Sequence, residues 1–369
     1  MSAGVTPALV LHILPVDLAR GAQTYAREMR CSLDDSETHH RTLTLFGPGA
    51  GTLQPDASLA VPSGVLRRVG LDPRAVMRLR KYLRVQRPRV VVAHGGEPLA
   101  YAVLAGVPRD QLVYYKIGIG GARLTTTKGT WHRWLLAHAG HVAAVSDAAA
   151  DEARALGVGP ERLRVIPNGR DPARYRLDRS DADGERPTRL VFVGHLTPSK
   201  RPAMFVDLVA ALRRDGLCIE AAIAGDGPLL EDVRARARGA GVEVLGAVRD
   251  VADLLARNDV LVFTSVPEGE GMPGVLIEAG MAGLPVVTTD VPGASSVVAD
   301  GQTGFVVPVG DFETLVRRTR ELVTDPARRR LFGQEARQRC EHEYSLDVSL
   351  QRWRALLHEI LNDPCTSST

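Results

Sequence analysis

The sequence predicts an α/β protein with two doubly wound parallel sheets. Short apolar runs recur along the chain, amphipathic helical stretches separate most of them, and a polar segment without apolar periodicity divides them into two series. Alternation of this kind is typical of parallel strands whose two sheet faces are covered by helices. The chain has 369 residues, which suggests about two domains at roughly 100–200 residues each.

The expected strands form an N-terminal and a C-terminal series. The first series is Leu9–Leu14, Val90–Ala93, Leu112–Ile117, His141–Val145 and Leu163–Ile166. The second series is Leu190–Val193, Ile219–Ala224, Val242–Leu245, Val260–Thr264, Pro285–Thr289 and Gly304–Val307. Helical periodicity predicts amphipathic helices over Met204–Asp215, Leu229–Gly239, Leu315–Val323 and Leu346–Leu361.

Residues rich in charge and turn formers mark the boundary between the two series. We expect an N-terminal domain over residues 1–172, a linker over 173–188 and a C-terminal domain over 189–345. A last helix and tail occupy 346–369, and the helix is expected to pack back on the N-terminal domain. The linker contains Asp181-Ala182-Asp183, a pattern that can bind a metal–diphosphate, but without a flanking strand it is interpreted as solvated.

Composition excludes several classes of function. The 46 basic and 43 acidic side chains give a net charge of +3. A charge this small does not produce the positive electrostatic field that drives nucleic-acid binding. The four cysteines lie far apart with no CxxC pair, which argues against a disulfide framework or a structural zinc site. No apolar run approaches the ~20 residues of a membrane span, and no signal peptide is recognisable. A cytoplasmic protein is therefore expected.

A basic helix is expected over Asp72–Arg87. Peripheral contact with a membrane surface or an acidic acceptor is one interpretation of its positive charge. A solvated face is favoured, because arginine is abundant throughout the chain. Lysine, in contrast, is rare: only four of the 46 basic residues are lysine, so each lysine is of more interest than usual.

The strongest chemical signal is the segment Pro267–Ala282, which directly follows the expected strand Val260–Thr264. Seven residues separate Glu270 from Glu278, among them Gly271, Met272, Pro273, Gly274 and Val275. We expect a helix to begin near Pro273 or Gly274, because proline suits a first helical turn. The free N–H groups of that turn favour an anion, and the carboxylates can accept hydrogen bonds from sugar hydroxyls. The segment predicts a phosphate cradle; a surface loop with two unrelated glutamates is the alternative.

Further loops are expected at the same sheet edge, where open α/β sheets bind ligands. The strand Leu190–Val193 leads into a loop that contains Gly194, His195, Lys200 and Arg201. The charges of Lys200 and Arg201 could neutralise a diphosphate. The next two strands lead into Gly225 and into Val248 and Arg249.

Together these segments resemble the retaining GT-B glycosyltransferases of family four. The segments that match, in family order and spacing across residues 188–312, are GHLTPSKRP, IAGDGPLL, LGAVRDVADLLARNDVLVFTS, EGMPGVLIEA, GLPVVTTDVPG and DGQTGFVVPVGD. In the first half, AVSDAAADEARALGV and RLRVIPNGRDPARY resemble the segment entering the interdomain crossover. The turn at Gly21 resembles the family's glycine-rich turn after the first strand. The ordered set is specific and covers most of the chain.

The resemblance implies two Rossmann-like domains facing a central cleft, with a nucleoside-diphosphate-sugar donor held mainly by the C-terminal domain. It implies that Glu278 accepts hydrogen bonds from the donor ribose and that Lys200 binds the diphosphate. Glu270 would contact donor-sugar hydroxyls, with the backbone N–H groups of about Met272–Val275 nearby. By the same resemblance the nucleobase lies near Val248 and Arg249, Gly21 near the diphosphate, and His94 near the transferred sugar.

One residue departs from the family pattern. The family usually has arginine after the glycine of the phosphate loop, whereas this chain has His195 after Gly194. Our hypothesis is that Arg201 or a protonated His195 partly replaces the missing charge, and a different donor contact is the alternative.

The resemblance further implies transfer with retention at the anomeric carbon, with Lys200, Glu270 and His94 as catalytic residues. No metal-ligand set is recognisable, and neither a metal nor a cofactor besides the donor is expected. A nucleotide-sugar epimerase and a non-catalytic nucleotide-sugar-binding protein are the alternatives; the glycine patterns are incomplete for a dehydrogenase. The nucleobase (uridine, guanosine, adenosine or thymidine) stays open. So does the acceptor, which could be a lipid, a polysaccharide, a small thiol precursor or an aglycone.

Overall fold

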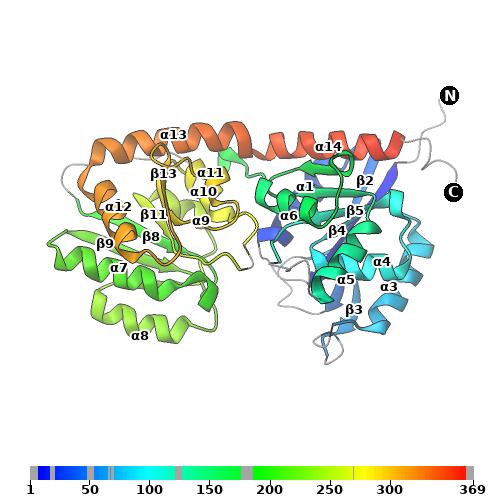
Figure 1. The fold of residues 1–369 in the computed structure, drawn as a ribbon, viewed down its shortest axis with the longest axis horizontal. Helices are drawn as coiled ribbons and strands as arrows, with labels where there is room; N and C mark the ends of the chain where they lie inside the picture. The colour runs from blue at the N-terminus through cyan, green and yellow to red at the C-terminus, as the bar shows by residue number, and fades with distance from the viewer. Residues whose placement is uncertain are drawn as a thin grey trace. The chain divides into compact units, whose positions relative to one another are not determined.

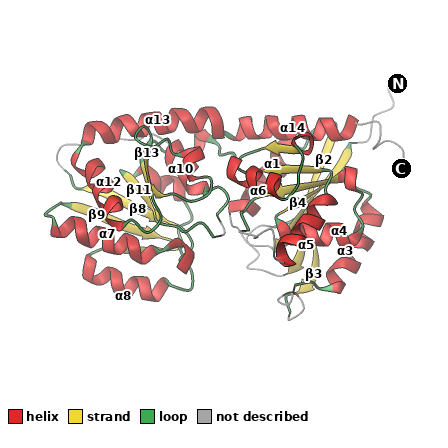
Figure 2. Ribbon diagram, viewed as in Figure 1, coloured by secondary structure: helices red, strands yellow, loops and turns green. Residues whose placement is uncertain are grey.

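The computed structural model describes residues 7–16, 21–47, 54–64, 67, 70–120, 127–175, 186–268 and 270–362. The chain forms two compact units, one made of Met1–Asn168 with Ser349–Thr369 and the other of Gly169–Val348. Each unit is a parallel sheet flanked by helices (Figure 1, Figure 2), which confirms the predicted fold class. The Asp181–Asp183 pattern lies outside the described residues.

The first unit contains a seven-stranded parallel sheet in the order β3-β2-β1-β4-β5-β6-β7. Its strands are β1 (Ala8–Val16), β2 (Thr38–Gly47), β3 (Ala57–Pro62), β4 (Val90–His94), β5 (Leu112–Lys116), β6 (His141–Ala144) and β7 (Leu163–Val165). Its helices are α1 (Gly21–Leu33), α3 (Pro73–Gln86), α4 (Gly96–Ala105), α5 (Thr127–Ala137) and α6 (Asp147–Ala155). Short 3-10 turns lie at Arg109–Gln111 and Pro160–Arg162.

Strands β2 and β3 were not among the expected strands. An apolar run predicts a buried strand, but β2 reads THHRTLTLFG and buries polar side chains along with its leucines. His40 and Thr44 on this strand are fully buried, and Thr42 is nearly so. Polar side chains such as these can be buried when they find hydrogen-bond partners elsewhere in the chain. Because those partners are distant in sequence, the local hydrophobic pattern does not predict that this strand is buried.

The second unit contains a six-stranded parallel sheet in the order β10-β9-β8-β11-β12-β13. Its strands are β8 (Thr188–Val193), β9 (Ile219–Ala224), β10 (Glu243–Gly246), β11 (Val260–Phe263), β12 (Val286–Thr289) and β13 (Gly304–Val307). Its helices are α7 (Pro202–Arg214), α8 (Leu230–Ala240), α9 (Val251–Ala256), α10 (Gly274–Met281), α11 (Ala294–Val297), α12 (Phe312–Thr324) and α13 (Pro326–Tyr344). Short 3-10 turns lie at Pro172–Arg174 and Pro198–Lys200.

The last helix, α14 (Leu346–Asn362), has the apolar face that the sequence predicts. Trp353 on that face is fully buried and lies edge-on to Tyr115 of β5, with ring centroids 5.1 Å apart. Ser349 at the start of the helix donates a hydrogen bond to the carbonyl oxygen of Pro167 (2.6 Å). Most of α14 therefore completes the core of the first unit.

Each sheet has a point where its strand order reverses. In the first sheet β1 lies between β2 and β4, and in the second sheet β8 lies between β9 and β11. Loops that leave the carboxyl ends of two such central strands run in opposite directions, and they leave a crevice where open α/β sheets bind ligands. The loops after β8 and β11 are the ones that contain the predicted phosphate cradle.

Candidate functional site

The loops after β8 and β11 are tied together by hydrogen bonds. The backbone N–H of Val266 donates to the carbonyl oxygen of Ser199 (2.8 Å). The hydroxyl of Thr264 lies 2.9 Å from the carbonyl oxygen of Lys200 and 3.0 Å from that of Arg201. These bonds hold the backbone of Lys200 beside the carboxyl end of β11.

The side chains of Lys200 and Glu270 meet at this reversal point. The Lys200 ammonium forms an ion pair with Oε1 of Glu270, and the hydroxyl of Ser265 donates to the same oxygen (2.6 Å). The ammonium also lies 4.9 Å from the ring centroid of Phe263. Glu270 is only 7% exposed, and an unpaired charge buried to that extent is costly. Lys200 and Ser265 therefore stabilise the buried carboxylate of Glu270.

Helix α10 begins shortly after Glu270 in the chain. Its first residue is Gly274, and the residue before it, Pro273, caps the helix without a side-chain hydrogen bond. The first-turn N–H groups are therefore not used by a capping side chain, and the helix dipole favours an anion there. The predicted helix start at Pro273 or Gly274 is confirmed.

Glu278 lies one turn into α10 and is held by an arginine that sequence reasoning missed. Nε of Arg170 donates to Oε1 of Glu278 (2.8 Å). The Arg170 backbone is fixed by hydrogen bonds to Tyr344 (3.0 Å) and from Leu346 (2.8 Å). A Cβ on Gly274 would lie 2.5 Å from an Arg170 nitrogen, so glycine leaves room for the guanidinium at the helix start.

The loop after β9 approaches the loop after β8 very closely. A Cβ on Gly225 would lie 1.9 Å from the carbonyl oxygen of Gly194, and the φ of Gly225 is +152°. The N–H of Gly194 donates to Ala224 (3.0 Å) and that of Leu196 to Asp226 (2.9 Å). Only glycine fits at Gly225, so this residue sets the shape of the predicted phosphate loop.

The remaining predicted residues of the second unit are spread along the sheet edge. Gly271 and Met272 are buried between Glu270 and α10, whereas His195 is exposed. Val248 and Arg249 follow β10, and β9 lies between β10 and β8. Arg201 lines a surface groove of about 750 Å³ together with Met204 and Asp207 of α7, and neither Lys200 nor Glu270 lines that groove.

Two predicted residues belong to the first unit. Gly21 is the first residue of α1. His94 is the last residue of β4 and is 1% exposed. Burial lowers the pKa of His94 to about 3, so its imidazole is neutral at physiological pH. Nε2 of His94 lies 3.0 Å from Nδ1 of His12.

Two kinds of feature are absent from the described part of the chain. It contains no group of three or more His, Cys, Asp and Glu side chains arranged to hold a metal ion. None of the described helices combines the length and the apolar character that crossing a membrane requires.

Comparison with known proteins gives matches for both units. Residues 19–174 match the family model described as Glycosyltransferase Family 4, and residues 187–325 match that of Glycosyl transferases group 1. Together the two models span most of the chain.

Curated relatives match in part. An exopolysaccharide phosphotransferase of Streptomyces coelicolor is 31% identical over 212 residues, which are 56% of this chain and 22% of that protein. A D-inositol 3-phosphate glycosyltransferase of Rhodococcus erythropolis is 32% identical over 231 residues, 55% of this chain and 52% of that protein. The chain thus spans about half or less of the length of these relatives.

The fold is also that of solved structures. The crystal structure of HepE from Anabaena, in complex with UDP and glucose, matches with a TM-score of 0.78 at 20% identity. The match covers 95% of this chain and all of that one. The two sheets therefore have the GT-B fold.

Proposed function

The chain belongs to glycosyltransferase family 4, the group 1 glycosyl transferases, and we propose that it transfers a sugar from a nucleoside-diphosphate sugar to an acceptor. The observation that carries this proposal is the meeting of Lys200 and Glu270 at the reversal point of the second sheet, in the loop that leads into α10. A cation and a helix N-terminus suit a diphosphate, and a carboxylate suits sugar hydroxyls.

The donor spans the sheet edge in this proposal. Its diphosphate lies at Lys200 and the first turn of α10, and its sugar at Glu270. The ribose donates hydrogen bonds to Glu278, which Arg170 holds in place. The nucleobase lies against the backbone near Val248 and Arg249. We propose that the donor is a uridine-diphosphate sugar, because a protein with the same fold was solved in complex with UDP and with UDP-glucose.

The chemical step that this site must promote is departure of the nucleoside diphosphate. As the anomeric C–O bond breaks, negative charge grows on the departing phosphate while the sugar becomes cationic. Lys200 and the α10 N-terminus stabilise that negative charge without a metal ion, and stabilisation of developing charge is usually the largest catalytic term. The acceptor oxygen bonds to the anomeric carbon on the same face, with retention, and its proton passes to the departing phosphate oxygen. Glu270 orients the sugar.

The proposal is tested in two steps with the full chain. Thermal shift with UDP, GDP, ADP and dTDP identifies the nucleotide, because a ligand that binds only the folded state raises the melting temperature. Release of that nucleotide from its sugar conjugates is then measured with panels of hydroxyl and thiol acceptors. Acceptor-dependent release with retained anomeric configuration is expected. Epimerised donor in the absence of any acceptor would contradict transfer.

A further inference from the structure

Three buried histidines in the first unit form a hydrogen-bonded row that ends at His94. Nε2 of His94 lies 3.0 Å from Nδ1 of His12, and Nε2 of His12 lies 2.9 Å from Nδ1 of His40. The three residues stand on the adjacent strands β4, β1 and β2. His12 and His40 are fully buried and His94 is 1% exposed. At its other end the row reaches Thr38, whose hydroxyl lies 3.2 Å from Nε2 of His40.

We propose that this row fixes the tautomer of His94, so that Nδ1 of His94 offers an unshared electron pair to a hydroxyl group of the bound substrate. His12, His40 and Thr38 are then positioning residues. The role of His94 toward a substrate rests on the proposed glycosyl transfer, whereas the tautomer of His94 does not.

Each imidazole in the row is neutral and carries one N–H proton. Burial lowers the pKa of His94 to about 3 and that of His40 to about 4. The pKa of His12 is also lowered, by burial and then by the neighbouring imidazoles. Three neutral rings share three N–H groups, so their hydrogen bonds can run in only two directions: every ring donates toward Thr38, or every ring donates toward His94.

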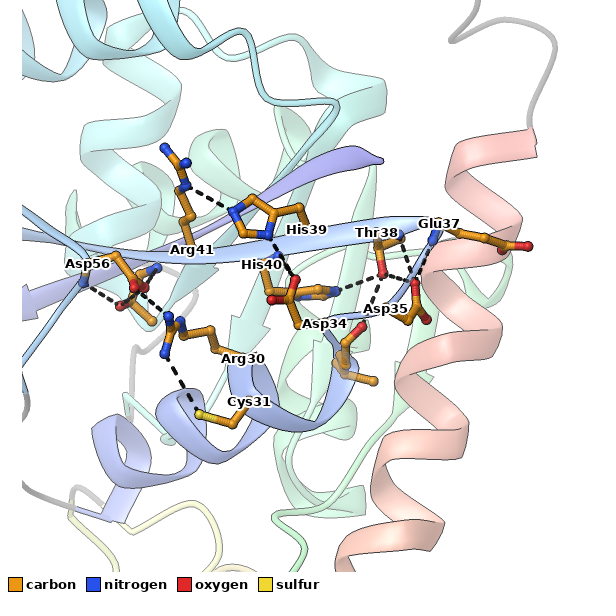
Figure 3. Close-up of polar contacts among 12 residues, drawn as sticks. Arg30, Cys31, Asp34, Asp35, Glu37, Thr38, His39, His40, Arg41 and Asp56 are labelled. Atoms are coloured by element: carbon orange, nitrogen blue, oxygen red, sulfur yellow. Dashed lines mark hydrogen bonds and ion pairs between the residues drawn. The ribbon is translucent and has the colours of Figure 1, made fainter. Parts of the chain in front are cut away.

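Thr38 decides between the two directions. Its hydroxyl lies 3.1 Å from a carboxylate oxygen of Asp35 (Figure 3) and 3.1 Å from the carbonyl oxygen of Leu33. Both are acceptors. Burial acts to raise the pKa of Asp35, but hydrogen bonds from the backbone N–H groups of Thr38 and Glu37 outweigh it, and the net pKa is lowered. The one hydroxyl proton of Thr38 is therefore committed to these oxygens, and Nε2–H of His40 must donate to Thr38.

The direction then propagates along the row. Nδ1 of His40 accepts from Nε2–H of His12, and Nδ1 of His12 accepts from Nε2–H of His94. Nδ1 of His94 is left without a proton, and it has no hydrogen-bond partner among the described residues. Such a buried acceptor costs free energy unless it is satisfied. His94 ends its strand just before the α4 N-terminus, at the sheet edge where ligands bind.

This geometry selects the chemistry of the group that can bind. An unprotonated ring nitrogen accepts a hydrogen bond from a hydroxyl but repels a phosphate oxygen. Nδ1 of His94 would therefore contact a sugar or acceptor hydroxyl and not the diphosphate.

The test is nuclear magnetic resonance of the full chain labelled with ¹⁵N-histidine, which distinguishes protonated from unprotonated ring nitrogens. We expect His12, His40 and His94 all to carry the proton on Nε2. In Thr38→Val the fixed acceptor is lost, and a fraction of His94 should carry its proton on Nδ1. Thr38→Ser keeps the hydroxyl and should restore the wild-type pattern. Thr44→Val is the matched control, because the Thr44 hydroxyl on the same strand is buried without a partner in the described chain.

Two results would overturn the proposal: a proton on Nδ1 of His94 in the wild type, or an unchanged His94 pattern in folded Thr38→Val. If Thr38→Val does not fold, the wild-type tautomer alone decides. With an acceptor in hand, Thr38→Val should lower kcat in proportion to the fraction of His94 rings that are protonated on Nδ1, by up to about tenfold, the worth of one hydrogen bond. Thr38→Ser and Thr44→Val should keep wild-type kcat. Absence of any transfer would refute the proposed function, and the tautomer result would stand.

Discussion

The two units place opposite chemistry at corresponding points of similar sheets. In the second unit, the reversal point beside β8 holds an ion pair between Lys200 and Glu270. In the first unit, the reversal point beside β1 holds the neutral, buried imidazole of His94. Similar sheets therefore present side chains at corresponding edges, and the residues at the strand ends decide whether that edge offers charge or a neutral acceptor. The proposed reaction needs the charged edge for the leaving diphosphate.

The largest effect is expected at the charged edge. Lys200→Ala should lower kcat by about 10²–10³, the cost of removing one donor that stabilises developing charge. Lys81→Ala is the matched control, because Lys81 is an exposed lysine of α3. Steady-state turnover is measured for both variants, with melting temperatures to verify folding. Equal kcat in the two variants would remove Lys200 from the reaction.

A smaller effect is expected for Glu278, one turn into α10. In the proposed donor complex, Glu278→Gln weakens a hydrogen bond between a charged group and the ribose, so donor affinity should fall about tenfold or more. Because the ribose contact is the same in the ground and transition states, KM should rise with little change in kcat. Glu335→Gln, at an exposed position of α13, is the control. A fall in kcat at constant KM would place Glu278 in the chemical step.

The buried, neutral histidines of the first unit should make its free energy of unfolding depend on pH. Unfolded histidine has a pKa near 6.5, whereas burial lowers those of His40 and His94 to about 4 and 3. The unfolded chain therefore binds more protons below about pH 6.5, and stability falls as pH falls toward these lower values. From pH 7 to pH 5 the loss should be on the order of 2 kcal/mol for each ring.

Tryptophan fluorescence during urea unfolding measures this loss in the first unit. All three tryptophans, Trp131, Trp134 and Trp353, belong to that unit. A His12→Gln variant carries one buried imidazole fewer, so its unfolding midpoint should depend less on pH. A wild-type midpoint that is the same at pH 7 and pH 5 would show that the row is not buried in solution.

The smallest effect concerns Arg201, whose φ of +46° and ψ of +50° place it in the left-handed region. Arg201→Gly should raise the free energy of unfolding by about 0.5–1 kcal/mol, because glycine adopts this conformation without strain. Donor KM should not change, because Arg201 lines the α7 groove, which neither Lys200 nor Glu270 lines. A raised KM would instead support the hypothesis that Arg201 replaces the missing family arginine.

Sequence patterns predicted the elements that depend on local signals. Every apolar run that was expected to form a strand does so, and α10 starts at Gly274 as expected. The family resemblance singled out Lys200 and Glu270, and the fold brings them together. The missed features depend on contacts distant in the chain. Strand β2 is buried although its sequence contains histidines and threonines, so it lacks an apolar run. Arg170 binds Glu278, which lies 108 positions further along the chain. The histidine row joins residues of three strands. No local periodicity reports such pairings.

The central claim, that Lys200 holds the leaving diphosphate, is tested most directly by a binding cycle. Calorimetry measures the affinities of UDP and of uridine for the wild type and for Lys200→Ala, with melting temperatures to verify that both are folded. We expect the variant to lose affinity for UDP, by about tenfold or more for a charged contact, and to bind uridine as the wild type does. Equal losses for UDP and uridine, or no loss for UDP, would contradict it.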